Sequence, residues 1–112
     1  SWTIADNEQK DNIVSEENEI ITIPAKSVGI LTSSPSTFRE TYVNYKYIFS
    51  VEDIAIGNGL GTSETIILSK NSYNDIFTYT SDDGANGNGK TLTRSCYNCA
   101  DWSEAVSSPG IL

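Results

Sequence analysis

Two cysteines, Cys96 and Cys99, stand in a Cys-Tyr-Asn-Cys motif near the end of the chain. In an oxidising compartment such a pair closes a small disulfide loop, whereas in the cytosol the same spacing serves redox chemistry or half of a zinc site. A zinc site would need two more ligands, but the chain has no other cysteine and no histidine. A thioredoxin-like role needs a strand-helix-strand context that the sequence does not offer. We therefore predict a disulfide between Cys96 and Cys99.

Hard oxygen ligands are concentrated in the segment Ser-Asp-Asp-Gly-Ala-Asn-Gly-Asn-Gly at residues 81–89. Asp82, Asp83, Asn86 and Asn88 offer the carboxylate and amide oxygens that calcium prefers, on a glycine-rich backbone that can curve around an ion. The spacing does not match an EF-hand loop, however, and no glutamate closes it. Because Asp, Asn and Gly also dominate ordinary turns, we predict a solvated loop and no cofactor, with calcium as the lesser alternative.

Carboxylates are the remaining candidates for general acid or base catalysis, because the chain contains no histidine. The acidic residues of the N-terminal region are Asp6, Glu8, Asp11, Glu16, Glu17 and Glu19. A pair of such groups can hydrolyse glycosides, but catalytic carboxylates need burial, and a run of acids in a polar segment is usually solvated. We expect a solvated loop here, no catalytic residues and no enzymatic activity.

The composition is that of one folded domain spanning residues 1–112, with 38% hydrophobic and 20% charged residues. Seven Lys and Arg residues against fifteen Asp and Glu residues give a net charge of −8. A surface this acidic repels phosphate backbones, so we expect no nucleic-acid partner. No stretch approaches the roughly 20 apolar residues of a membrane-spanning helix, so we also expect no membrane insertion.

Short runs rich in Ile, Val, Thr, Tyr and Phe alternate with clusters of Gly, Asn, Asp, Ser and Pro, and helical periodicity is nearly absent. This pattern predicts an all-β fold of about seven short strands, in a sandwich or an open barrel. The predicted strands are residues 2–5, 19–23, 28–32, 41–49, 62–68, 75–80 and 91–94. Three consecutive apolar residues at 66–68 indicate a central strand covered on both faces.

The predicted strand at residues 41–49 has the clearest alternation in the chain. Its expected core face consists of Val43, Tyr45, Tyr47 and Phe49. Its opposite face consists of Tyr42, Asn44, Lys46 and Ile48. Tyrosine is favoured where one end of the ring stays in water, as it does at protein interfaces. Tyr42, Asn44 and Lys46 are therefore the candidate contact face for a protein partner.

The most specific strings lie in the C-terminal third: Gly-Lys-Thr-Leu-Thr-Arg at 89–94, Asp-Trp-Ser-Glu-Ala at 101–105 and Ser-Pro-Gly at 108–110. They resemble the closing signature of the lamin-tail domain family, in which a Gly-Ser/Thr-Leu-X-Arg strand precedes a Trp and a Thr-Pro-Gly-like turn. Further matches follow in the family's order: Trp-Thr-Ile at 2–4, Ile-Pro-Ala at 23–25, Ile-Leu at 30–31, Ile-Gly-Asn-Gly-Leu at 56–60, and the strands at 65–68 and 75–79. The resemblance covers nearly the whole chain.

This resemblance implies an immunoglobulin-like β-sandwich used for attachment, which nuclear lamins carry as a globular tail and bacteria and archaea carry on secreted or surface proteins. It implies no active site. The family normally has two strands before its first Trp, with Ile-Asn-Glu and Glu-Leu/Tyr-Asn motifs, whereas here no such motifs precede Trp2; residues 32–47 also look like an insertion. A sandwich without these strands exposes backbone edges and apolar surface, so we expect another segment to fill the gap.

We therefore expect a non-enzymatic extracellular or cell-surface module or subunit, structural or adhesive, that acts through protein–protein contacts. A strand from a neighbouring copy or from an upstream segment completes the sandwich. In the strongest form of this hypothesis, neighbouring copies supply the strand and the homo-oligomer extends into a filament. The alternative is an accessory binding module cut from a larger secreted hydrolase. A short parent reading frame favours the subunit, and a long one containing histidines or paired acids favours the module.

Overall fold

The computed structural model describes residues 2–15, 22–43, 45–53, 55–57, 59–96 and 99–109. Within these residues the fold is all-β and sandwich-like, with eight strands and two short helices. The strands are β1 (Thr3–Ala5), β2 (Lys10–Ser15), β3 (Ile30–Leu31), β4 (Ile48–Val51), β5 (Glu64–Lys70), β6 (Tyr73–Tyr79), β7 (Thr91–Arg94) and β8 (Trp102–Ala105). The helices are α1 (Pro35–Thr41) and the 3-10 turn η1 (Ser81–Asp83).

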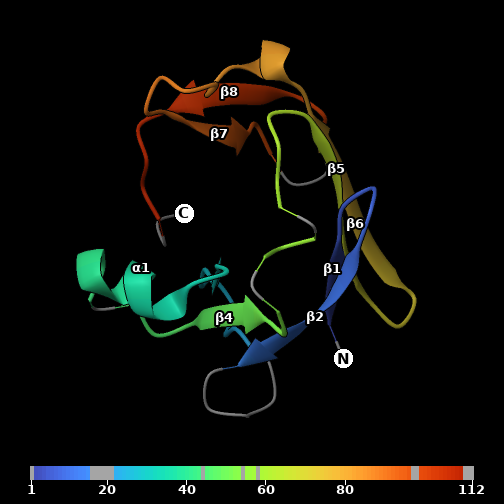
Figure 1. Ribbon diagram of the computed structural model, residues 1–112, viewed down its shortest axis with the longest axis vertical. Helices are drawn as coiled ribbons and strands as arrows, with labels where there is room; N and C mark the ends of the chain where they lie inside the picture. The colour runs from blue at the N-terminus through green and yellow to red at the C-terminus, as the bar shows by residue number, and fades with distance from the viewer. Residues whose placement is uncertain are drawn as a thin grey trace.

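Six strands form one curled sheet in the order β3-β4-β2-β1-β5-β6. Its neighbouring strands are antiparallel, apart from the parallel pair β3–β4. Figure 1 shows β5 and β6 along one side of the molecule and β4 across its base. The antiparallel hairpin of β7 and β8 is a separate sheet that lies across the top. The curled sheet and the hairpin thus enclose the interior from different sides.

The longest ladder joins β5 to β6 through seven residue pairs, from Glu64–Tyr79 to Lys70–Tyr73. The two strands are connected by a two-residue turn in which Asn71 has a φ of 54°. Few side chains tolerate this left-handed conformation, and Asn is among those that do. The turn therefore fixes the register of the β5–β6 hairpin.

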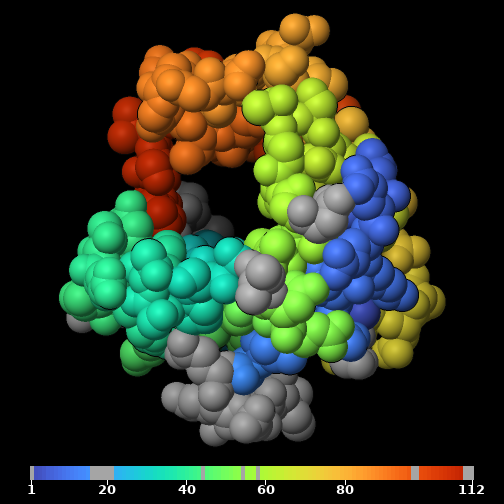
Figure 2. Space-filling view, viewed as in Figure 1, coloured from blue at the N-terminus to red at the C-terminus, as the bar shows by residue number. Residues whose placement is uncertain are grey.

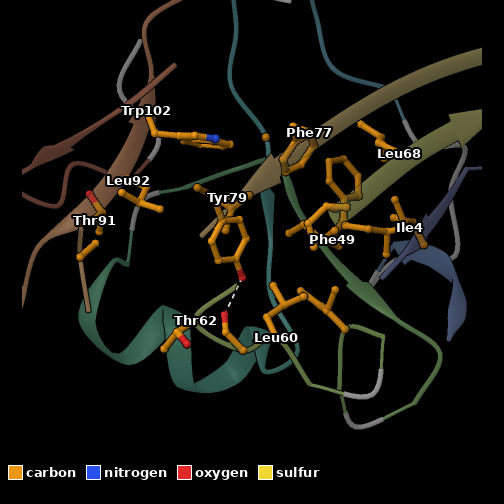
Figure 3. A pocket seen from close by; sticks show the side chains of 18 of the residues that line it. Ile4, Phe49, Leu60, Thr62, Leu68, Phe77, Tyr79, Thr91, Leu92 and Trp102 are labelled. Atoms are coloured by element: carbon orange, nitrogen blue, oxygen red, sulfur yellow. Dashed lines mark hydrogen bonds between the residues drawn. The ribbon is translucent and has the colours of Figure 1, made fainter. Parts of the chain in front are cut away.

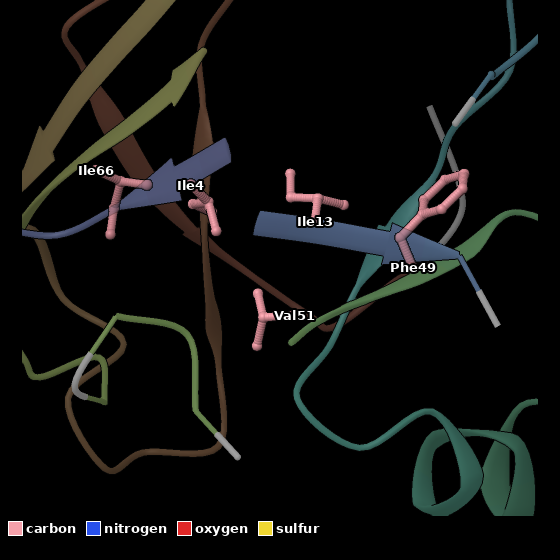
Figure 4. Packing of buried hydrophobic residues seen from close by; sticks show 5 residues of the cluster. All are labelled: Ile4, Ile13, Phe49, Val51 and Ile66. Atoms are coloured by element: carbon pink, nitrogen blue, oxygen red, sulfur yellow. The ribbon is translucent and has the colours of Figure 1, made fainter. Parts of the chain in front are cut away.

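The hydrophobic core lies where β1, β2, β4 and β5 meet (Figure 4). Its buried members are Ile4, Ile13, Phe49, Val51 and Ile66. Ile66, which is 2% exposed, projects from β5. Because β5 is paired with β1 on one side and β6 on the other, the predicted central position of residues 66–68 is confirmed. The predicted cover on both faces is incomplete, since Ile67 and Leu68 are only half-buried.

Most of the predicted strands are present. Residues 2–5, 28–32, 62–68, 75–80 and 91–94 correspond to β1, β3, β5, β6 and β7 with shifted ends. The predicted strand at 19–23 falls mainly on residues outside the described ranges, and Thr22 and Ile23 belong to no strand.

The predicted strand at residues 41–49 is wrong for most of its length. Helix α1 ends at Thr41, and β4 begins only at Ile48. The helix starts at Pro35, whose fixed φ suits a first helical turn and which has no backbone N–H to leave unpaired. The expected inward face is wrong for Val43, which is 69% exposed, and it misses Ile48, which is 3% exposed. It is confirmed for Phe49, which is buried in the core, and Tyr47 packs against that core. The alternation of aromatic residues here comes from a helix and a loop.

The prediction of a solvated acidic loop is wrong for residues 10–15, which form β2. Asp11 is 2% exposed, and its carboxylate accepts hydrogen bonds from the Gly57 backbone N–H (2.6 Å) and the Gln9 side-chain amide (3.1 Å). Asp6 is also buried and accepts backbone hydrogen bonds within the β1–β2 turn. These carboxylates therefore hold loops in place. Each is buried with hydrogen-bond partners, as buried polar groups in folded proteins usually are.

We predict that Ile66→Ala destabilises the fold by about 2–5 kcal/mol, because it leaves a cavity among the buried side chains of the core. Ile76→Ala is the matched control, since Ile76 lies on the neighbouring strand β6 and is 59% exposed. It should change the free energy of unfolding by at most about 0.5 kcal/mol. Urea unfolding of both variants measures the difference, and equal losses would contradict this description of the core.

Candidate functional site

A large apolar cavity lies between the curled sheet and the β7–β8 hairpin. Its volume is about 1000 Å³. Figure 3 shows apolar side chains from both sheets converging on this space, and Figure 2 shows the hollow between the hairpin, α1 and the segment before β5. Residues that line it include Ile4, Phe49, Leu68, Phe77, Leu92 and Trp102. The inner side of the cavity is thus continuous with the hydrophobic core.

Leu92 and Trp102 form the hairpin side of the cavity. Both side chains are only half-buried. The indole N–H of Trp102 donates a 2.7 Å hydrogen bond to the Thr78 carbonyl of β6. The Trp102 ring also packs against Phe77 and Tyr79, at centroid distances of 6.0 and 6.1 Å. The hairpin therefore meets β6 through side chains and leaves the space beneath it unfilled by the described residues.

Few polar groups reach the cavity. The Tyr79 hydroxyl donates a 2.7 Å hydrogen bond to the Gly61 carbonyl (dashed in Figure 3). Burial raises the pKa of the Tyr79 phenol above its usual value, and the nearby Glu64 carboxylate adds to this rise. Among the described lining residues Lys90 is the one with a charged side chain, and its ammonium lies 3.6 Å from the Glu104 carboxylate. This lining is suited to binding apolar groups and offers no paired carboxylates.

The glycine-rich segment at residues 81–89 is held by its own hydrogen bonds. Asp83 accepts a 2.7 Å hydrogen bond from the Thr80 backbone N–H, in a capping box on η1. Glu104 accepts hydrogen bonds from the Ala85 N–H (2.7 Å) and the Asn88 amide (2.9 Å). Within the described part of the chain, no group of three or more His, Cys, Asp or Glu side chains is arranged to hold a metal ion. The carboxylates of Asp83 and Glu104 thus bind backbone and amide groups of this segment.

Cys96 and Cys99 form the predicted disulfide, with their Cα atoms 5.1 Å apart. The bridge lies in the connection from β7 to β8, and Cys96 is exposed. Such a bond is compatible with an extracellular protein. In the described ranges no helix is long and apolar enough to cross a membrane.

The candidate contact face of Tyr42, Asn44 and Lys46 is not one face of a strand. Tyr42 is the residue that caps the end of α1, and its ring stacks on Phe38 with centroids 4.8 Å apart. Lys46 is exposed in the loop before β4, and Asn44 lies outside the described residues. Tyr42 thus belongs to an aromatic cluster with Phe38 and Tyr45.

Comparison of the chain with protein-family models, with curated proteins and with solved structures found no match. The resemblance to the lamin-tail family therefore stays a prediction from the sequence motifs.

The hydrogen bonds that Glu104 accepts should make the stability of this region depend on pH. The bonds from the Ala85 N–H and the Asn88 amide, together with nearby Lys90, hold the pKa of the Glu104 carboxyl below its usual value of 4.5. A lowered pKa means that the folded state favours the ionised form, so this contribution is present above pH 4.5 and is lost as the pH falls through the lowered value.

We therefore expect Glu104→Gln to reduce the loss of stability on acidification below pH 4.5. Urea unfolding across a pH series measures this, and NMR titration of the Glu104 carboxyl measures its pKa directly. The matched control is Glu40→Gln, which changes an exposed glutamate on α1. Parallel profiles for Glu104→Gln and the unsubstituted chain would contradict the proposed role of these hydrogen bonds.

Proposed function

We propose that this chain is a non-enzymatic module of an exported structural or adhesive protein, and that it acts through protein–protein contacts. Its apolar cavity is the contact site, and an extended strand from a neighbouring copy of the chain completes it. Repetition of this contact assembles the chain into a homo-oligomer and, at its limit, into a filament. The disulfide between Cys96 and Cys99 supports an extracellular setting.

The size of the cavity carries this proposal. The cavity is open to solvent, so water lies against its apolar walls. Covering such walls contributes about 25 cal/mol per Å² of apolar surface removed from water. Apolar groups from another molecule or segment therefore stabilise the fold by entering the cavity.

Free strand edges favour a polypeptide as the occupant. Among the described residues β3 pairs only with β4, and β7 pairs only with β8. Both of these strands line the cavity, through Ile30 and Leu31 on one side and Thr91 and Leu92 on the other. An inserted strand can hydrogen-bond to such an edge while its alternate side chains enter the apolar space. A small apolar molecule fills the space but leaves the backbone groups of both edges unpaired.

Charge sets the conditions under which copies associate. Each copy carries a net charge of −8, so two copies repel one another at low ionic strength. Added salt shortens the screening length from about 30 Å at 0.01 M to about 3 Å at 1 M. Strand exchange driven by apolar burial should therefore strengthen as salt is added.

We predict that analytical ultracentrifugation detects self-association of this chain that increases between low and high salt. Leu31→Lys should abolish it, because the substitution places a charge among the apolar groups of the cavity. Ile76→Lys is the matched control, since Ile76 is exposed on the outer strand β6 and does not line the cavity. Near-ultraviolet circular dichroism establishes that both variants keep their tertiary structure.

A folded chain that stays monomeric at every salt concentration would overturn the proposal of self-assembly. Loss of association in Ile76→Lys, with association retained in Leu31→Lys, would place the contact on the outer edge of β6 instead. Binding of an apolar dye to the cavity, without any association, would point to a small-molecule ligand.

A further inference from the structure

The β7–β8 hairpin covers the cavity, yet no strand pairing joins it to the curled sheet among the described residues. Figure 1 shows the hairpin crossing above the interior, with β6 at one end of it. A cover attached only through side chains can separate from the sheet without breaking a backbone ladder. The side chains that attach it therefore control access to the cavity.

Arg94, at the end of β7, is the central attachment. Its guanidinium bonds both carboxylate oxygens of Asp75 on β6, at 3.1 and 3.3 Å. It also lies over the Phe77 ring, 5.2 Å from the centroid. Both members of the ion pair are largely buried, so the pair is less screened by solvent than a surface pair. Arg94 stands directly opposite Trp102, the other side chain that bonds to β6.

The disulfide supports Arg94 from the opposite side. The Nε–H of Arg94 donates a 3.3 Å hydrogen bond to the Cys99 carbonyl. Cys99 is fixed by its bond to Cys96 and by a 3.1 Å hydrogen bond from its own N–H to the Cys96 carbonyl. The guanidinium is therefore held between the disulfide loop and Asp75. Since Cys96 is exposed, an external thiol can reach the bridge.

We propose that the Cys96–Cys99 disulfide is a redox-sensitive latch on the cavity, an inference that rests on the proposed function of the cavity as a contact site. An external dithiol reduces the bridge by thiol–disulfide exchange: two electrons and two protons pass to the sulfurs, Cys96 and Cys99 become thiols, and the reagent becomes a disulfide. The Cys99 carbonyl is then released from its fixed position, Arg94 loses that support, and the hairpin separates more readily from β6. Reduction thereby weakens the binding of an inserted strand.

Hydrogen exchange of the Trp102 indole N–H, followed by NMR, tests the latch in the chain alone, because this proton bonds the Thr78 carbonyl only while the hairpin is closed. Dithiothreitol should speed its exchange about tenfold, as expected for the loss of one hydrogen bond to a charged group. The Ile13 backbone N–H is the internal reference, since it donates a 3.0 Å hydrogen bond to the Trp2 carbonyl within the curled sheet. The double substitution Cys96→Ser and Cys99→Ser should exchange at the faster rate of the dithiothreitol-reduced chain. It should also remove the response to dithiothreitol.

Asp75→Asn tests whether the effect passes through Arg94. This variant should exchange faster in the oxidised state and respond less to dithiothreitol, because the ion pair that reduction weakens is already lost. Asp101→Asn, which changes an exposed carboxylate in the same connection, should respond like the unsubstituted chain. Equal Trp102 exchange in both redox states, or an undiminished response in Asp75→Asn, would overturn the latch.

Sedimentation in both redox states separates this proposal from the proposed function. Association that weakens on reduction, together with faster Trp102 exchange, supports both. Association that is equal in the two states overturns the latch and leaves the contact site standing. If the Trp102 indole N–H exchanges faster on reduction but the chain associates in neither redox state, the contact between copies is overturned. The opening of the hairpin on reduction then still stands.

Discussion

The unequal division of strands between two sheets is the constraint on which this structure depends. In the part of the chain that the structure describes, six strands form the curled sheet and only the short β7–β8 hairpin lies opposite. A sandwich is stable when the inward faces of its sheets cover one another. Here the inward face of β5 and β6 extends beyond the residues that pack against it, and Phe77 and Tyr79 are only half-buried as a result. The cavity, the half-buried Trp102 and the free strand edges are consequences of this imbalance.

Side-chain hydrogen bonds join several segments of the chain that are not paired as strands. Asp11 ties β2 to the connection after β4 through the Gly57 N–H, and Glu104 ties β8 to the glycine-rich segment through the Ala85 N–H. Arg94 and Asp75 do the same between the two sheets. Each bond is short-range and directional, so it fixes position where the apolar contacts alone are sparse. The acidic composition thus contributes to the architecture as well as to the charged surface.

The sequence predicts the all-β class, the disulfide and the central strand because each depends on local residue types: β-branched runs, paired cysteines and the apolar run at 66–68. Its failures have physical causes. Val43, Tyr45, Tyr47 and Phe49 recur at every second position as in a strand. However, Ser34-Pro35 starts a helix, and Phe38 stacks on Tyr42 at helical spacing. The sequence predicts a solvated Asp11 because the residue that hydrogen-bonds its carboxylate, Gly57, is 46 residues away. The cavity has no local signature, since it is defined by what two distant sheets fail to cover.

The pairing of β1 with β5 has a consequence for how the chain acquires its structure. Thr3 lies opposite Ser69, so β1 completes its pairing only after synthesis has continued for 66 further residues. The β1–β2 hairpin can form early, but Ile4 and Ile13 then remain in water until β5 emerges from the ribosome. Long-range pairing of this kind slows folding and prolongs the lifetime of intermediates with exposed apolar surface. Until β5 is available for pairing, the exposed apolar side chains of these strands can drive aggregation between nascent chains.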